Sequence, residues 1–214
     1  MDRSRVFLLS PANCAGARAR MVLSERATFP LAVRLRSAAG APIGEVFSFM
    51  SGLYFRGKLT YARAFAAAPD PESPISGAGV FVITPTAGLR AADTPLTVDA
   101  IRSFAAVDVD AANTDYRRPL ERSARALARD LGACDVVLLG SIASSKYVDV
   151  LADIFGARLL FPAAFVGRGD MSRGGLLLRA AAAGVELSYV PIEGAVRHGQ
   201  RPPKLDPLTR PSRG

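Results

Sequence analysis

The sequence has little of what many catalytic and metal-binding sites require: it contains one histidine, two cysteines and no tryptophan in 214 residues. The single histidine, His198, lies near the C-terminus, so neither a Ser-His-Asp nor a Cys-His triad has a base in the expected folded region. Cys14 and Cys134 are too few for a zinc site or a disulfide framework. We therefore expect no metal site, and any chemistry must use Asp, Glu, Lys, Arg, Ser, Tyr or Cys.

Two nucleotide-binding signatures are also absent. Residues 140–146, GSIASSK, have no glycine before Lys146 and so do not form a Walker sequence, and no dinucleotide fingerprint follows the first apolar run. We expect no cofactor. No apolar run approaches the ~18 residues that a membrane-spanning helix needs, and residues 6–9 are too short for a signal-peptide core. We expect a protein of the reducing cytoplasm with no membrane partner.

Positive charge is what the chain has in excess, with a net charge of +8. The proline-rich residues 197–214, RHGQRPPKLDPLTRPSRG, hold five basic residues and one aspartate, which is half of that excess. This composition predicts a disordered basic tail, whereas residues 1–196 are expected to form a single domain. A basic domain with a basic tail favours an anionic partner, either nucleic acid or a nucleotide.

Short apolar runs alternate with segments of helical spacing along the chain. The runs expected as strands are residues 6–9, 80–83, 136–139, 158–161 and 185–190. Helical spacing covers residues 54–67, 116–131 and 146–155; Thr97 is expected to begin a further helix and Gly132 to end the second. Residues 69–79 are expected to be an exposed loop. The pattern predicts an α/β fold, a three-layer sandwich with a largely parallel central sheet of four to five strands.

A small, polar, glycine-containing segment follows each of the first four expected strands. These segments are residues 10–16, 84–88, 140–146 and 166–175. In open α/β sheets, ligands bind beyond the carboxyl ends of the strands. Four such segments at one sheet edge favour a ligand pocket there.

The last of these segments, VGRGDMSRGG, is expected to be a loop that precedes a helix beginning near Leu176. Glycines let backbone N–H groups approach a ligand, and arginines present planar forks to a phosphate. Asp170 is the only carboxylate nearby, so it either orients the arginines or acts as a base. A solvated loop with a salt bridge is the alternative. The phosphate-binding residues expected here are Arg168, Gly169, Ser172, Arg173 and Gly174.

Four other residues are candidates for ligand contact. Ser10 and Asn13 could meet a base or a sugar, although Asn13 could equally form an Asx turn. Lys146 could bind phosphate at a helix N-terminus or be a surface charge. Ser144 could donate to phosphate or cap the helix that follows.

Several neighbouring residues carry weaker hypotheses. Arg56 and Lys58 belong either to the same positive rim or to a solvated helix face. The aromatic side chains of Tyr54 and Tyr147 are expected to pack in the core, where Cys14 is expected to be a small buried filler.

Five short elements resemble, in order, landmarks of the YaaA-like proteins, a family associated with peroxide stress and DNA binding. They are SPA at 10–12, YFRGKL at 54–59, ITPTAGL at 83–89, ASSKY at 143–147 and SRG at 172–174. Residues 94–96, TPL, stand where that family shows a Tyr-Arg pair. The third and fourth strand exits also resemble those of uracil-DNA glycosylases, which read a flipped base there. These resemblances imply an α/β fold with a pocket at the strand ends and DNA binding.

Three functions remain open from the sequence. The first is binding of nucleic acid or a nucleotide, in a response to DNA damage or oxidative stress, with phosphate held by Lys146, Arg168 and Arg173. The second is hydrolysis of an N-glycosidic bond, in which Asp170 activates water or stabilises an oxocarbenium-like transition state. The third is a protein-interaction module whose loops bind a partner.

Overall fold

The computed structural model describes residues 4–143, 145–196, 199–203 and 205. Its main sheet has four parallel inner strands, in the spatial order β3 (Val80–Thr84), β1 (Arg5–Leu9), β6 (Asp135–Leu139) and β7 (Leu159–Pro162). Two antiparallel strands form the edges, β4 (Gly88–Ala91) beside β3 and β8 (Tyr189–Pro191) beside β7. The largely parallel sheet is confirmed, with six strands instead of four or five.

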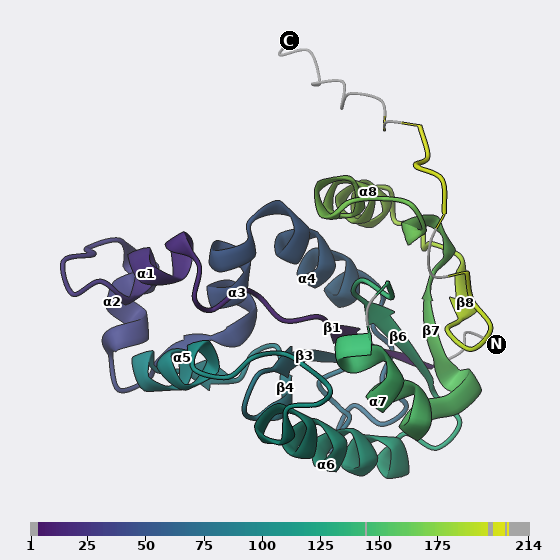
Figure 1. Ribbon diagram of the computed structural model, residues 1–214, viewed down its shortest axis with the longest axis horizontal. Coiled ribbons are helices and arrows are strands. Elements are labelled where there is room, and N and C mark those ends of the chain that lie inside the picture. The colour runs from purple at the N-terminus through teal and green to yellow at the C-terminus, as the bar shows by residue number, and fades with distance from the viewer. Residues whose placement is uncertain (1–3, 144, 197–198, 204, 206–214) are drawn as a thin grey trace.

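Helices cover both faces of this sheet. On one face lie α4 (Leu53–Phe65) and α8 (Asp170–Ala183), and on the other lie α6 (Thr114–Asp130) and α7 (Ser145–Phe155) (Figure 1). The structure therefore confirms the α/β three-layer sandwich. None of the helices in the described part of the chain is both long and apolar enough to span a membrane.

A smaller group of elements lies past the end of β1, and of its helices the sequence predicted only the last (Figure 1). It contains α1 (Ala17–Leu23), α2 (Pro30–Arg36), α3 (Ile43–Ser51) and α5 (Val98–Ala105), with β2 (Ala41–Pro42) paired to β5 (Pro95–Leu96). The helices α1, α2 and α3 are short, at 7, 7 and 9 residues. Helices of this length are marginal alone, so tertiary packing stabilises them.

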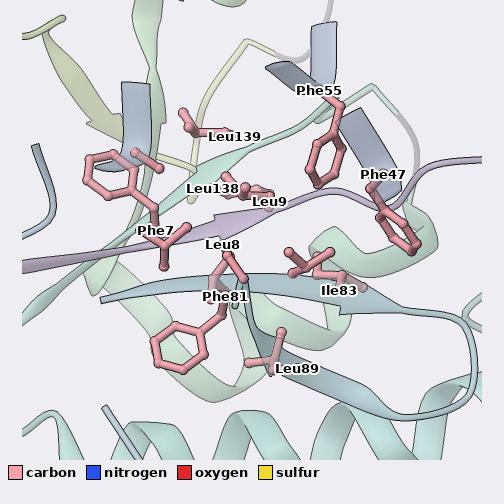
Figure 2. Packing of buried hydrophobic residues seen from close by; sticks show 14 of the residues in the cluster. Phe7, Leu8, Leu9, Phe47, Phe55, Phe81, Ile83, Leu89, Leu138 and Leu139 are labelled. Carbon is pink, nitrogen blue, oxygen red and sulfur yellow. The ribbon is translucent and has the colours of Figure 1, made fainter. Parts of the chain in front are cut away.

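The inner strands form where the sequence has continuous apolar runs. β1, β3 and β6 agree with their predictions within a residue at each end. They are buried on both faces, and side chains from these strands pack with Phe47 and Phe55 of α3 and α4 in one core (Figure 2). β7 begins at Leu159, because Arg158 belongs to a 3-10 turn that starts at Gly156.

The fifth expected strand, residues 185–190, is mostly wrong. Only Tyr189–Pro191 pairs with β7, and it does so antiparallel. The backbone N–H of Leu187 donates to the hydroxyl of Tyr61 at 2.8 Å, and Glu186 pairs with Arg5. These side-chain partners take the place of a strand ladder over the first half of the segment.

The predicted helices are largely confirmed. α4, α6 and α7 cover the segments with helical spacing, and α5 begins after Thr97, whose side chain caps the amide of Ala100 at 3.4 Å. Gly132 follows α6 with a positive φ of 54°, as expected for the residue that ends a helix. Residues 69–79 have neither helix nor strand and are mostly exposed, as predicted.

The segment 166–175 is not the loop that the sequence predicted. α8 begins at Asp170, six residues before Leu176, and includes Ser172, Arg173 and Gly174. Gly174 is tolerated inside the helix because it packs against α4: a Cβ on it would lie 2.9 Å from the carbonyl oxygen of Leu53. A Cβ on Gly57 would lie 2.6 Å from the carbonyl oxygen of Gly174. Two glycines thus allow α4 and α8 to cross in close contact.

The exit of β3 is also different from expectation. Residues 84–88 form a tight turn into β4, in which the Thr84 hydroxyl donates to the Gly88 carbonyl at 2.8 Å. Gly88 has a φ of +69° and its position leaves no room for a Cβ beside Pro119. The polar groups of residues 84–88 are used within this turn. Only the segments that follow β1, β6 and β7 therefore contribute to the sites described below.

Candidate functional site

A buried lysine lies at the carboxyl end of β1. The Nζ atom of Lys58 donates to the Ser10 carbonyl oxygen at 2.7 Å and lies 2.8 Å from Ser10 Oγ. Lys58 is 1% exposed and Ser10 is 7% exposed. Ser10 follows β1 directly, and Lys58 reaches it from the middle of α4. The amino group of Lys58 is therefore buried, and both of its hydrogen bonds are to uncharged oxygen atoms of Ser10.

Burial disfavours the charged form of Lys58, whereas two aromatic rings favour it. Its Nζ lies 4.6 Å from the ring centroids of both Tyr54 and Phe55, within the range of a cation–π interaction. Burial lowers the pKa of Lys58 from 10.5 to about 7, and the carboxylate of Asp170 only partly opposes this shift. A lysine with this pKa is neutral in roughly half of the molecules near neutral pH, so it can accept a proton.

Tyr147 and Gly140 complete the cluster from the β6 side. The Tyr147 hydroxyl donates to the Ser141 carbonyl at 3.0 Å. Burial raises the pKa of Tyr147, while a hydrogen bond with Ser10 and one with Ser141 oppose the rise. A Cβ on Gly140 would lie 2.8 Å from the Tyr147 hydroxyl and 2.9 Å from Ser10 Cβ. The absence of a side chain at residue 140 is what lets Tyr147 approach Ser10.

Arg173 of α8 reaches the same cluster. Its Nε and Nη2 atoms both donate to the Phe165 carbonyl at 3.2 Å, and its Nη1 lies 3.5 Å from Asp170 Oδ1. The Arg173 side chain is 11% exposed, whereas that of Asp170 is 67% exposed. Asp170 therefore lies at the solvent side of the cluster and Arg173 inside it.

The Tyr54 hydroxyl is the unpaired group of this cluster. Burial raises the pKa of Tyr54, and the nearby Arg173 guanidinium opposes that rise. Arg173 can only donate to this buried oxygen, so the hydroxyl proton of Tyr54 has no acceptor among the described residues. A buried hydroxyl without a partner costs about 1–3 kcal/mol, so the cluster has a donor available for a ligand.

Two cavities flank the first turn of α8. The larger, of about 780 Å³, lies between the starts of α1, α4 and α8 and the end of α3, and its charged lining residues are Arg18 and Arg56. The smaller, of about 350 Å³, lies between α8 and residues 201–203 and 205, and its charged lining residues among those described are Arg168, Arg179 and Arg201. Met171, which is 68% exposed, lines both. Among the described residues, no carboxylate lines either cavity.

The structure divides the residues predicted to bind phosphate. Asn13 lines the larger cavity, where its Oδ1 also accepts the Ala15 amide at 3.0 Å in an Asx turn. Arg168, Gly169 and Ser172 line the smaller cavity, and Arg168 Nη1 donates to Ser172 Oγ at 3.2 Å. The predicted residues therefore do not converge on a single cavity.

The other predicted residues lie elsewhere. Ser10, Asp170 and Arg173 belong to the buried cluster around Lys58. Gly174 faces α4 in the helix crossing. Lys146 is exposed on α7 and lines neither cavity. Ser144 and His198 lie outside the described residues.

The sequence hypotheses for Lys58 are wrong, because it is part of neither a positive rim nor a solvated face. Its neighbours at helical spacing are Tyr54, Phe55, Tyr61 and Ala62, all of which are buried. A lysine in the middle of an apolar helix stripe was a signal available in the sequence. Tyr54 and Tyr147 are buried as expected, as is Cys14, whose pKa is raised by burial to about 12.

Comparison with protein-family models, with curated proteins and with solved structures gives no match to this chain. The resemblance to the YaaA-like proteins and the weaker one to uracil-DNA glycosylases therefore remain predictions.

Proposed function

We propose that this protein binds a nucleotide or a segment of nucleic acid through its phosphates, in the two cavities beside the start of α8. One observation carries the proposal: five arginines line these adjacent cavities, and no carboxylate of the described residues lines either. Arginine is suited to phosphate because its planar fork donates two parallel hydrogen bonds. The volume of the larger cavity, about 780 Å³, is within the usual range for small-molecule sites.

The two cavities suit a ligand with more than one anionic group. They share Met171, so they are adjacent, and a ligand spanning them would pass over an exposed apolar side chain. A flexible thioether makes favourable contacts with aromatic rings, including those of bases. The same arrangement fits a nucleotide or neighbouring phosphates of a nucleic acid, with the base against Met171.

Neutralising one arginine in each cavity is expected to weaken binding. Arg56→Gln and Arg168→Gln should each raise the dissociation constant by about 10-fold, because a charged hydrogen bond to phosphate is lost. Fluorescence polarisation with a labelled DNA duplex, and with a labelled nucleoside triphosphate, measures both ligand forms at one salt concentration.

Arg118→Gln is the matched control for these variants. Arg118 is exposed on α6, on the opposite face of the sheet, and its substitution removes the same charge. An equal loss in Arg118→Gln would show that general charge attraction, and not the cavities, accounts for binding. Failure of the wild-type protein to bind either ligand would contradict the proposal and favour the protein-interaction module.

The basic tail is expected to add affinity that depends on salt and not on sequence. Deleting residues 197–214 removes five basic residues, so the slope of log binding constant against log salt should become shallower by up to about 4. The deletion also removes Arg201, which lines the smaller cavity. Arg210→Gln with Arg213→Gln removes two of the tail charges and leaves Arg201 in place. An unchanged slope in the deletion variant would show that the tail does not contact the nucleic acid.

The structure gives no specific support to hydrolysis by Asp170. Its side chain is largely exposed, pairs with Arg173 at 3.5 Å and lines neither arginine cavity. We therefore do not include a catalytic Asp170 in the proposed function.

A further inference from the structure

We propose that Ser10 is a nucleophile for acyl transfer from a carboxylic ester and that Lys58 is its general base. The proposal goes beyond phosphate binding and does not depend on it, because it concerns the buried cluster and neither arginine cavity. Serine with a lysine base is one of the known alternatives to a triad containing histidine. Such a pair needs no histidine, and the one histidine of this chain is at position 198, far from Ser10 in the sequence.

The positions of the two residues suit these roles. Lys58 Nζ lies 2.8 Å from Ser10 Oγ, within the distance at which a base removes a proton. Its second hydrogen bond, to the Ser10 carbonyl oxygen at 2.7 Å, fixes the direction of the amine. Ser10 keeps some solvent contact, whereas Lys58 lies behind it with almost none. Ser10 also directly follows β1, at the sheet edge where α/β proteins place their ligands.

The state of Lys58 suits a base as well. Proton acceptance requires the neutral amine, and the lowered pKa of about 7 provides it near neutral pH. This amine contacts Ser10 and the rings of Tyr54 and Phe55, and the cluster around it also holds Tyr147, Asp170 and Arg173. The carboxylate of Asp170, the two ring faces and the Ser10 carbonyl oxygen favour the protonated amine, but burial outweighs them.

The unpaired Tyr54 hydroxyl provides a donor for negative charge that develops on an ester oxygen. Lys58 Nζ contacts both Ser10 Oγ and the Tyr54 ring, which places Tyr54 beside the reacting pair. Arg173 lies next to this hydroxyl and adds positive charge without leaving its bonds to the Phe165 carbonyl. Buried donors aimed at a developing oxyanion are a large source of catalysis.

The reaction balances without any further reactant except water. Ser10 Oγ bonds to the acyl carbon while Lys58 Nζ takes the hydroxyl proton. The bond between the acyl carbon and the alcohol oxygen then breaks, and the alcohol leaves with the proton from Lys58. The oxygen of a water molecule next bonds to the acyl carbon while Lys58 takes a proton from this water. The bond between the acyl carbon and Ser10 Oγ then breaks, Lys58 returns the proton to Ser10 Oγ, and the carboxylic acid leaves.

A fluorophosphonate probe tests the pair in the full chain. Ser10 Oγ forms a bond to phosphorus, the phosphorus–fluorine bond breaks, fluoride leaves and Lys58 accepts the proton. We expect intact-mass spectrometry to show one adduct, peptide mapping to place it on Ser10, and the labelling rate to rise with pH through a midpoint of about 7. Hydrolysis of p-nitrophenyl acetate by the same samples should follow the same profile.

Variants separate a chemical role from a structural one. Ser10→Ala should show no adduct, Lys58→Met should label at least ~100-fold more slowly, and the exposed Ser103→Ala should label like wild type. If Lys58→Met does not fold, Ser10→Cys tests the role of Lys58 as the base. The rate at which iodoacetamide alkylates the thiol at position 10 should then rise with pH through a midpoint below the ordinary cysteine pKa of about 8.5. No adduct on wild-type Ser10, equal labelling in folded Lys58→Met, or a cysteine midpoint at or above the ordinary value would overturn the proposal.

Discussion

Replacing Lys58 with methionine is expected to remove a rise in stability with pH that the wild-type protein shows between about pH 7 and pH 10. The pKa of Lys58 is lowered from 10.5 to about 7 in the folded state. Below pH 7 the folded protein carries a buried ammonium, and this cost is present in full. Between the two pKa values the unfolded chain binds a proton that the folded chain does not, so stability increases as the pH rises.

The size of this effect is large for a single side chain. The slope is about 1.4 kcal/mol per pH unit, so the full interval corresponds to an upper bound on the order of 5 kcal/mol. The methionine variant lacks the charge and keeps an apolar chain of similar length beside Tyr54 and Phe55. At about pH 6 it should therefore be at least as stable as wild type, with its advantage shrinking toward pH 10.

Urea unfolding of wild type and Lys58→Met across this pH range measures the difference directly. The buried Cys14 and Cys134 have pKa values raised to about 12 and about 11, which lowers stability above pH 9, but both are present in both proteins and cancel. Lys146→Met on the exposed face of α7 is the matched control and should keep the wild-type pH profile. A difference between wild type and Lys58→Met that does not vary with pH would contradict a neutral buried lysine.

Adding a methyl group at Gly174 is expected to destabilise the protein by about 1–3 kcal/mol, because it would overpack the crossing of α4 and α8. The new Cβ would lie 2.9 Å from both the Leu53 carbonyl oxygen and the Tyr54 Cα, which are backbone atoms that cannot turn aside. Separation of the helices would also move Arg173 away from Tyr54. Chemical unfolding at neutral pH measures the change in free energy.

Gly175→Ala is the neighbouring control for this prediction. A Cβ on Gly175 meets only the end of the Leu205 side chain, at 3.6 Å, which is an ordinary contact. Alanine is favoured over glycine inside a helix by up to about 1 kcal/mol, so Gly175→Ala should leave stability unchanged or raise it. Equal destabilisation by both substitutions would show that the contact with α4 does not explain the effect at Gly174, because helix propensity favours alanine at both positions.

The sheet and its main helices could be predicted because their signals are local. Four continuous apolar runs gave the four parallel strands, and helical spacing gave α4, α6 and α7. The edge strand β4 carries no such run. Residues 185–190 were predicted as a strand, but at residues 185–188 the hydroxyl of Tyr61 and the charge of Arg5 take the place of a strand partner. The short helices α1, α2 and α3 likewise form only by packing on the rest of the protein.

The candidate sites were predicted only in part for a related reason. The arginines of residues 166–175 were recognised from their own sequence, but Arg18, Arg56, Arg179 and Arg201 come from four separate segments. Lys58 was predicted to lie either on a positive rim or on a solvated helix face, although its apolar neighbours at helical spacing indicated burial. Its partner Ser10 lies 48 residues earlier in the chain, and no local pattern links the two.

The sequence by itself determined the fold class, the edge of the sheet at which polar exits gather, and the absence of a histidine base from residues 1–196. These properties depend on composition and on short-range periodicity, which the chain carries at every point. The tertiary structure alone decided that the segment 166–175 is mostly helix, that Arg168 lines the smaller cavity while Arg173 joins the buried cluster, and that Lys58 meets Ser10. Those outcomes depend on contacts between distant segments, above all the glycine contact that brings α8 against α4.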